Sequence, residues 1–453
     1  MERGPFIRTL IVLAVALGLG SYLYFVESKK EIKPDEKAKE KVFTVDAAAK
    51  VKELELSSTD RIHLVREGSN WRMTEPTQAP ADATEVDAMV SGLTGLELDE
   101  VVGDNVTDLA QYGLAQPRTT LKATVEGGTP GGLTLLLGDK TPDGAGVYAK
   151  TGASPRVFTI AAFHESALAK KPFDLRDRDV LHFKQDAASS LDVTGPEGAF
   201  SLAADGTEWT IVRPIATRAG RWAVDGLVGA LAGLRMESVA AEDAEEMKPW
   251  GLVTPWRTVR IGLKDGSSRS LEIGGKAGEK TFYAREAGRK QVVVIPGALV
   301  DDLAKGLADL RAKRLLEVAT YEVTSIEAQA GATKRSYLRT SEKDKEGVDV
   351  FKWKRTAPDA AAIDTNKVQD ALFAVGALEA LEFVDAPGPA ADYGLDAPAL
   401  RVSLKYEDAQ KPIAWFELGQ KGDAWYAKRA GDTAVLKLDP AKAAALVKSF
   451  GEL

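Results

Sequence analysis

The sequence predicts an α+β fold: an N-terminal transmembrane helix followed by three tandem homologous modules, each built as antiparallel strands, a helix, further strands and a second helix. Two observations lead to this prediction. An almost wholly apolar run comes first in the chain, and one set of short motifs then returns three times in the same order at near-constant spacing. Self-similarity over such a long period is the signature of a repeat architecture.

The repeats are marked by several motifs that keep their order. A tryptophan precedes a proline, an aromatic-Gly-Leu element precedes a second proline, an apolar run ends at a glycine, and a Tyr-Ala pair with a basic residue follows. The tryptophans are Trp71, Trp209 and Trp353, and the glycines are Gly138, Gly274 and Gly419. The aromatic-Gly-Leu elements are Tyr112-Gly113-Leu114, Trp250-Gly251-Leu252 and Tyr393-Gly394-Leu395. So many motifs in one order indicate three homologous units.

Each unit holds one stretch in which apolar residues recur at helical spacing. These stretches run over 86–96, 224–234 and 368–378, and Asp82, Asp225 and Asp364 lie in or just before their first turns. A carboxylate there interacts favourably with the helix dipole. Such a stripe could form a groove for a partner helix, but its repetition favours packing on the module's own sheet. Second helices are predicted over 161–171, 296–310 and 440–450.

Short alternating stretches bounded by turn residues predict strands on both sides of the first helix. In the first unit they run over 51–57, 61–67 and 70–74, and then over 119–125, 133–137, 146–150 and 156–160. The glycine-rich turns between them are typical of antiparallel hairpins. We divide the chain into a transmembrane signal-anchor (1–26), a charged tether (27–45) and repeat modules over 46–185, 186–320 and 321–453.

The N-terminal run from Phe6 to Val26 is long enough, at ~1.5 Å per residue, to cross a hydrocarbon layer of ~30 Å. The alternative is a cleaved signal peptide, but no small-x-small cleavage site closes the segment. Lysines are dense after the run, and under the positive-inside rule alone they would favour a cytoplasmic body. A short basic N-terminus before the first apolar segment is nevertheless usual for exported proteins, so we expect the body to be extracytoplasmic.

Composition excludes several classes of function. The chain of 453 residues has a formal net charge of −8, which gives no general attraction to nucleic acid. It has no cysteine, which excludes disulfides, thiolate zinc sites, Fe–S clusters and a cysteine nucleophile. Three histidines, His63, His164 and His182, all lie in the first unit, and a metal site would need them to converge.

Other motifs point only weakly to chemistry. The stretch 274–281 resembles a P-loop, but Glu279 stands where the glycine before Lys-Thr is required, so we expect no nucleotide site. His164-Glu165 begins like a zincin helix, but Leu168 replaces the second histidine. The carboxylates of the first connector could form a paired site, although local ion pairs with the neighbouring arginines are favoured. The residues concerned are Asp177, Asp179, Asp186, Arg176 and Arg178.

The aromatic-Gly-Leu element itself could be a ligand platform that presents the rings of Tyr112, Trp250 and Tyr393. The favoured alternative is a tight turn, because glycine permits a left-handed backbone while the aromatic residue and leucine pack inward. We therefore assign no catalytic, cofactor-binding or metal-ligating residues.

Taken together, the apolar N-terminal run, the Trp…Pro and aromatic-Gly-Leu-x-x-Pro elements, the Leu-Gly…Tyr-Ala-Lys run and the Asp-Leu-Arg-x-Arg connector resemble a bacterial family, domain of unknown function 4340. The resemblance covers nearly the whole chain beyond the tether. It implies an inner-membrane-anchored, periplasmic protein, of a kind often encoded beside components of ABC transporters and of gliding-motility systems, and it supplies no catalytic residues.

We accordingly expect a non-catalytic accessory, binding or scaffolding protein. Its predicted partners are the membrane, through Phe6 to Val26, and either ABC transporter subunits or an envelope polymer, with no nucleic acid, nucleotide or cofactor. Two alternatives stay open: a hydrolase of an envelope polymer that uses carboxylates between modules, and a purely structural spacer.

Overall fold

The computed structural model describes residues 40–44, 51–126, 132–152, 154–196, 198–206, 208–343, 345–408 and 411–453. Its contacts divide the chain into two compact units, Met1–Asp177 and Arg178–Leu453. The first unit holds one nine-stranded sheet and the second unit holds two. Three tandem modules are therefore present, as the motif spacing predicted.

Module 1 is one antiparallel sheet in the order β4-β3-β2-β1-β6-β7-β8-β9-β5. Helix α2 connects β4 to β5, which are the two opposite edges, so the helix crosses the full width of the sheet. Pairing of β1 with β6 at the centre joins the strands that precede α2 to those that follow it. The elements are β1 (Val51–Ser57), β2 (Arg61–Glu67), β3 (Asn70–Glu75), β4 (Ala79–Ala81), α2 (Ala83–Thr94), β5 (Glu100–Gly103), β6 (Thr119–Val125), β7 (Leu133–Lys140), β8 (Gly146–Thr151), β9 (Val157–Ala161) and α3 (Ala162–Leu168).

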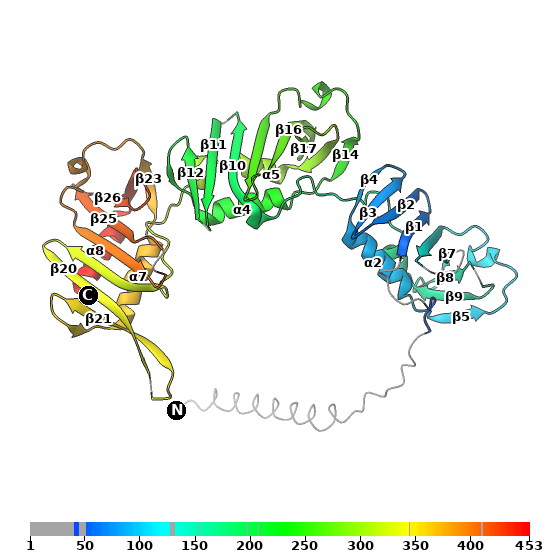
Figure 1. Ribbon diagram of the computed structural model, residues 1–453, viewed down its shortest axis with the longest axis horizontal. Helices are drawn as coiled ribbons and strands as arrows, with labels where there is room; N and C mark the ends of the chain where they lie inside the picture. Colours follow the sequence, from blue (N-terminus) through cyan, green and yellow to red (C-terminus); the bar gives the residue numbers. More distant parts are fainter. Residues whose placement is uncertain are drawn as a thin grey trace, which may run out of the picture. The chain divides into compact units, whose positions relative to one another are not determined.

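Modules 2 and 3 repeat this topology strand for strand. Module 2 consists of β10 (Ala188–Gly195), β11 (Gly198–Asp205), β12 (Glu208–Arg213), β13 (Thr217–Arg218), α4 (Arg221–Ala232), β14 (Ser238–Ala241), β15 (Arg257–Leu263), β16 (Ser268–Gly278), β17 (Thr281–Glu286), β18 (Val292–Pro296), α5 (Gly297–Leu303) and α6 (Leu307–Leu310). Module 3 consists of β19 (Val323–Ala330), β20 (Thr333–Lys343), β21 (Asp349–Ala357), β22 (Ala361–Ala362), α7 (Thr365–Ala377), β23 (Ala380–Val384), β24 (Leu400–Tyr406), β25 (Ala414–Lys421), β26 (Ala424–Arg429), β27 (Val435–Leu438) and α8 (Pro440–Glu452). In module 3 the β20–β21 hairpin is long and projects beyond the rest of its sheet (Figure 1).

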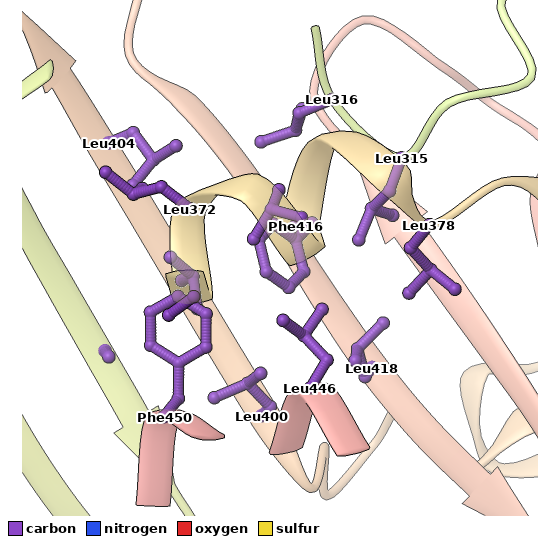
Figure 2. Packing of buried hydrophobic residues seen from close by; sticks show 14 of the residues in the cluster. Leu315, Leu316, Leu372, Leu378, Leu400, Leu404, Phe416, Leu418, Leu446 and Phe450 are labelled. Atoms are coloured by element: carbon purple, nitrogen blue, oxygen red, sulfur yellow. The ribbon is translucent and has the colours of Figure 1, made fainter. Parts of the chain in front are cut away.

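The core of each module lies between the helices and one face of the sheet. Alternate residues of β24 are buried, which places Leu400 and Leu404 on the same face. Figure 2 shows these leucines packed with Phe416 of β25 against Leu446 and Phe450 of α8. The intervening residues of β24 are polar or charged, so the opposite face is hydrophilic, as is common for antiparallel sheets with one covered face.

The predicted fold class was wrong. The described residues are 45% strand and 20% helix and form mostly antiparallel sheet, rather than an α+β arrangement. Part of the reason is that two edge strands in each module, such as β4 and β5, are too short to give an alternating pattern, and β4 contains Pro80. The strands on either side of the first helix also form one continuous sheet.

The predicted membrane span, Phe6 to Val26, lies outside the residues that the structure describes. Within the described ranges, no helix is both long enough and apolar enough to cross a membrane.

The second helices vary more than the sequence suggested. In module 1, α3 ends at Leu168, and in module 2 the predicted helix over 296–310 is divided into α5 and α6, with Gly306 between them. The helix α8 of module 3 extends to Glu452. The first helices lie where the sequence predicted them, and their apolar stripes pack on the sheet. In α2 and α7 the predicted aspartates, Asp82 and Asp364, cap the helix by accepting backbone hydrogen bonds.

The chain enters every module in the same way. A short segment pairs with the residues just after the first helix, as when Val42 N donates to Leu96 O in module 1. The corresponding bonds are Val180 N to Leu234 O and Leu315 N to Leu378 O. Phe43, which the sequence division placed in the tether, is buried in the core of module 1.

Modules 2 and 3 also share a polar contact within the second unit. The Arg429 guanidinium forms an ion pair at 2.8 Å with Asp432, and both side chains are almost fully buried. Arg429 also donates to the carbonyl oxygen of Ala312, and Thr217 Oγ1 of module 2 donates to Asp432 at 2.9 Å.

Candidate functional site

The aromatic-Gly-Leu element forms the same tight turn in all three modules. A short 3₁₀ helix ends at the aromatic residue, and the glycine after it is left-handed, with φ of 67° at Gly113, 68° at Gly251 and 66° at Gly394. The leucine that follows is buried in each case. The backbone therefore requires glycine at this position, since other residues rarely adopt positive φ.

A second glycine explains the repeated apolar-run motif. A Cβ atom added at Gly138 would lie 2.1 Å from the carbonyl oxygen of Tyr112. At Gly274 the corresponding distance to Trp250 O is 2.2 Å, and at Gly419 the distance to Tyr393 O is 2.4 Å. The turn therefore sits directly on the strand, and only glycine leaves enough space.

The three aromatic residues that were considered, and not favoured, as a ligand platform each pack on a tyrosine of their own module. Tyr112 lies edge-on to Tyr148 with ring centroids 4.9 Å apart. Trp250 meets Tyr283 at 4.9 Å and Tyr393 meets Tyr426 at 5.1 Å in the same geometry. All these rings are half-buried. Each module thus holds a separate aromatic pair.

The other sequence motifs fall on ordinary elements. The stretch 274–281 covers the end of β16 and the start of β17, so a hairpin rather than a helix follows it. His63 bonds to Thr74 in β2 and β3, while His164 lies on α3 beside Phe163. Among the described residues, no group of three His, Asp or Glu side chains is arranged to hold a metal ion.

The connector carboxylates do not share one environment. Asp177 belongs to the first unit, where its backbone N donates to Pro80 O. Asp179 pairs with Arg235 at 3.7 Å in the second unit. Asp186 lies farther along, at the rim of a hollow in module 2.

This hollow is the candidate site. It has a volume of about 300 Å³ and lies between the first two turns of α4 and the adjacent ends of β10, β11 and β15. Its lining combines apolar and charged side chains: Gln185, Asp186, Ala188, Ala204, Gly206, Trp209, Arg221, Asp225, Val228 and Lys264. We call it the Trp209 hollow.

Trp209 and Asp225 are the equivalents of Trp71 and Asp87 in module 1. Trp209 is the second residue of β12, as Trp71 is of β3, and Asp225 is the fifth residue of α4, as Asp87 is of α2. In module 1 the Trp71 indole N–H donates to Asp87 Oδ1 at 2.9 Å. In module 2, Asp225 Oδ2 lies 3.5 Å from Arg221 Nε.

The modules differ at the residue opposite this tryptophan. In the strand register, Arg66 pairs with Trp71 and Arg339 with Trp353, but Ala204 pairs with Trp209. The space that arginine occupies in modules 1 and 3 is therefore left open in module 2. The hollow carries no chemical motif in the sequence, because its signal is the loss of one side chain from a repeated position.

A second depression lies in module 1 beside β5 and β9, and its lining includes Asp99, Glu100 and Asp143. Asp143 accepts hydrogen bonds from Thr141 Oγ1 and from the backbone of Ala145, and these hold the pKa of its carboxyl below the usual value. This depression is polar and open, and Tyr148 is the aromatic residue in its lining.

Three tandem sheets, each covered on one face by helices and one of them carrying the Trp209 hollow, define a tandem-repeat protein rich in antiparallel β-structure. The family model for domain of unknown function DUF4340 matches residues 71–210, 209–390 and 353–453. The chain therefore belongs to this family, which confirms the resemblance seen in its motifs.

Other comparisons add little. A search of curated proteins gave no match. Among solved structures, the DNA polymerase sliding clamp of Pseudomonas aeruginosa is similar over 88% of this chain and 94% of its own, with 8% identity and a TM-score of 0.18. The DNA polymerase III β subunit of Borrelia burgdorferi is similar over 88% of this chain and 93% of its own, with 6% identity and a TM-score of 0.17. Likenesses this weak carry no argument about fold or function.

Proposed function

We propose that this chain is a non-catalytic binding or scaffolding protein. It acts outside the cytoplasm, is held at a bacterial inner membrane through the apolar run Phe6 to Val26, and serves as an accessory to an ABC-type transporter complex. The observation that carries the binding role is the Trp209 hollow, where one module keeps the common framework and leaves a side-chain-sized space open.

Repetition supports this role. Each module has its own core between sheet and helices, so three modules in series present an extended outer surface on which a partner can bind. Two of the three equivalent positions are filled by an arginine of the chain itself, and the third is open. That difference is expected when one repeat has been adapted to receive a group from another molecule.

The shifted carboxyl pKa values lend no support to the hydrolase alternative. Glycosidases need one carboxylic acid whose pKa is raised so that it can protonate the leaving group. Among the described residues, every carboxyl pKa that clearly shifts is lowered. Glu342, for example, accepts hydrogen bonds from Lys354 and Lys352, which lower its pKa to about 2. The remaining shifts have similar causes and occur at Glu40, Asp143, Asp265 and Glu322.

The membrane and transporter parts of the proposal rest on the apolar run and on the family resemblance. They are tested by solubilising membranes from the native host in mild detergent, capturing the full-length chain through a C-terminal tag, and identifying co-purified proteins by mass spectrometry. A variant lacking residues 6–26 is the control, and it should leave the membrane fraction. We expect transporter subunits to be enriched with the full chain only.

If no transporter subunit is enriched above the control, the accessory role is rejected. A reporter fused after Leu453 tests the orientation separately. Activity of a reporter that works only in the cytoplasm would contradict an extracytoplasmic body.

A further inference from the structure

We propose that the Trp209 hollow binds the guanidinium group of an arginine side chain supplied by a partner protein. This inference rests on the proposed binding function and specifies the chemistry of its ligand. It is drawn from the chain itself, because modules 1 and 3 each place an arginine in the equivalent space.

Module 1 shows how a guanidinium fits. Arg66 projects from β2 over the Trp71 ring, with its guanidinium carbon 4.5 Å from the ring centroid. Its Nε donates to Val51 O at 3.1 Å, and its Nη2 donates to Asp87. The side chain is mostly buried. A cation over a tryptophan face that also pairs with a carboxylate gains from both interactions.

The residues that Arg66 contacts correspond to residues that line the hollow. Val51 is the first residue of β1, and its equivalent is Ala188, the first residue of β10. Trp71 and Asp87 correspond to Trp209 and Asp225. The tryptophan ring, the carboxylate and the strand backbone of the guanidinium site are therefore all present in module 2, although Ala204 stands in place of the arginine.

Module 3 fills the same space through different partners. Arg339 Nη2 donates to Glu407 at 3.1 Å, and Nη1 donates to the carbonyl oxygen of Tyr321. Glu407 directly follows β24, and its equivalent after β15 is Lys264. Tyr321 precedes β19 by the same interval that separates Asp186 from β10. Arg339 also lies over the Phe351 ring, with its guanidinium carbon 4.7 Å from the centroid. The two arginines thus contact six positions, and the module 2 equivalents of all but Phe351 line the hollow.

The hollow also suits the apolar part of an arginine. Ala188 and Val228 are buried beside Trp209, so they can contact the methylene groups of an incoming side chain. Gln185 is held at the rim by a hydrogen bond from Nε2 to the backbone carbonyl of Asp225. The site is open to solvent, as it must be to admit a side chain from outside.

Arg221 is the main competitor for Asp225. It has no cationic counterpart in modules 1 and 3, where the first helical residue is Ala83 or Thr365. Its contact with Asp225 is long, at 3.5 Å, and its side chain is 43% exposed, so an incoming guanidinium can displace it. Removing Arg221 should therefore strengthen binding of a cation.

The charges also define the rival hypothesis. Asp186 and Asp225 are balanced by Arg221 and Lys264 around the rim. If Arg221 and Lys264 are themselves the ligand-binding groups, the hollow takes a carboxylate, and removing Arg221 abolishes binding instead. The effect of Arg221→Ala consequently separates the two hypotheses by its sign.

The experiment is calorimetric titration of the full chain in detergent with Nα-acetyl-L-arginine amide. The control ligand is Nα-acetyl-L-citrulline amide, which has nearly the same shape without the charge. We expect the arginine amide alone to bind. Asp225→Asn should weaken it about tenfold, as expected for loss of a charged hydrogen bond. Ala204→Arg should abolish binding, because the new side chain fills the space from within, and Arg221→Ala should tighten it.

Asp205→Asn is the matched control for Asp225→Asn, since Asp205 is exposed at the end of β11 and should leave binding unchanged. A short peptide containing arginine that binds more tightly than methylguanidine would indicate a protein source for the ligand. The reverse order would indicate a free small guanidine and would overturn the partner-protein part of the proposal.

The proposal is overturned if the arginine amide fails to bind, if citrulline binds equally, or if Arg221→Ala abolishes binding and Nα-acetyl-L-glutamate amide binds the wild type. Asp225→Asn keeps the test decisive if Ala204→Arg does not fold. Co-purified transporter subunits without arginine binding would reject this inference and leave the proposed function intact. Arginine binding without co-purified transporter subunits would support this inference and reject the accessory role at a transporter.

Discussion

Replacing Asp432 by alanine should destabilise the second unit more than most single substitutions. The Asp432 carboxylate is fully buried and pairs at 2.8 Å with Arg429, whose side chain is 1% exposed. Burial already lowers the pKa of the Arg429 guanidinium despite this partner. Without Asp432, a buried positive charge loses its counter-ion, and Thr217 Oγ1 loses its acceptor.

The expected loss is about 3–5 kcal/mol, the range found when one partner of a buried ion pair is removed. With a urea m-value of about 3 kcal/mol/M, the midpoint falls by about 1–1.7 M. Asp432→Asn keeps an oxygen acceptor and should lose less. The control Asp423→Ala changes an exposed aspartate of the β25–β26 turn and should leave the midpoint within about 0.5 kcal/mol of wild type.

The assay is equilibrium urea unfolding followed by tryptophan fluorescence, because Trp353 and Trp425 are buried in module 3 and report its unfolding. A loss below about 1 kcal/mol for Asp432→Ala would refute the reasoning, since a value that small is typical of a solvated surface pair. It would mean that the contact between modules 2 and 3 is hydrated in solution.

Three further predictions concern packing, helix propensity and pH. Gly274→Ala should cost about 3 kcal/mol or more in urea unfolding, because its Cβ would lie 2.2 Å from Trp250 O, while Gly275→Ala, with 3.7 Å to the same atom, should be tolerated. Gly226→Ala should raise stability by about 1 kcal/mol, because Gly226 is inside α4 with open space around it. The Glu342 carboxyl should titrate near pH 2 by NMR, and Lys354→Ala should move its pKa toward 4.5. The pKa of Glu342 is lower in the folded state than in the unfolded state. The ion pair therefore stabilises the β20–β21 hairpin above about pH 4.5, and this stabilisation is lost as the pH falls toward 2. An unchanged pKa of Glu342 in Lys354→Ala would contradict the role of this ion pair.

The repeat could be predicted from sequence because its marker residues have little freedom. Gly113 must adopt a positive φ, and Gly138 must leave space for the carbonyl of Tyr112, so both recur at fixed spacing. The same holds for buried tryptophans such as Trp71. Most long strands were also predicted, because one face is buried and the other polar, which produces clear alternation.

The fold class could not be read in the same way, because sheet continuity depends on pairing between distant strands. Nothing local to β1 or β6 reveals that they lie side by side. The edge strands β4 and β5 are held by their neighbours rather than by their own sequence pattern. The break between α5 and α6 is local in origin, because Gly306 caps α6 and its backbone N donates to Asp309 Oδ2 at 3.2 Å.

The Trp209 hollow was hidden for a related reason. Arg66 and Ala204 stand at the same distance before their tryptophans, but Arg339 stands farther from Trp353 because the β20–β21 hairpin is longer. A comparison by spacing therefore aligns only two of the three residues. Strand register is required to show that all three are paired with the equivalent tryptophan.

The central claim is that module 2 holds an open guanidinium site, and a double-mutant cycle tests it most directly. The free energy of unfolding is measured for wild type, Ala204→Arg, Asp225→Asn and the double variant. If the introduced arginine occupies the hollow as Arg66 occupies its own site, it should couple favourably to Asp225 by about 1.5–3 kcal/mol. A coupling energy near zero, with Ala204→Arg destabilising equally in both backgrounds, would contradict the claim.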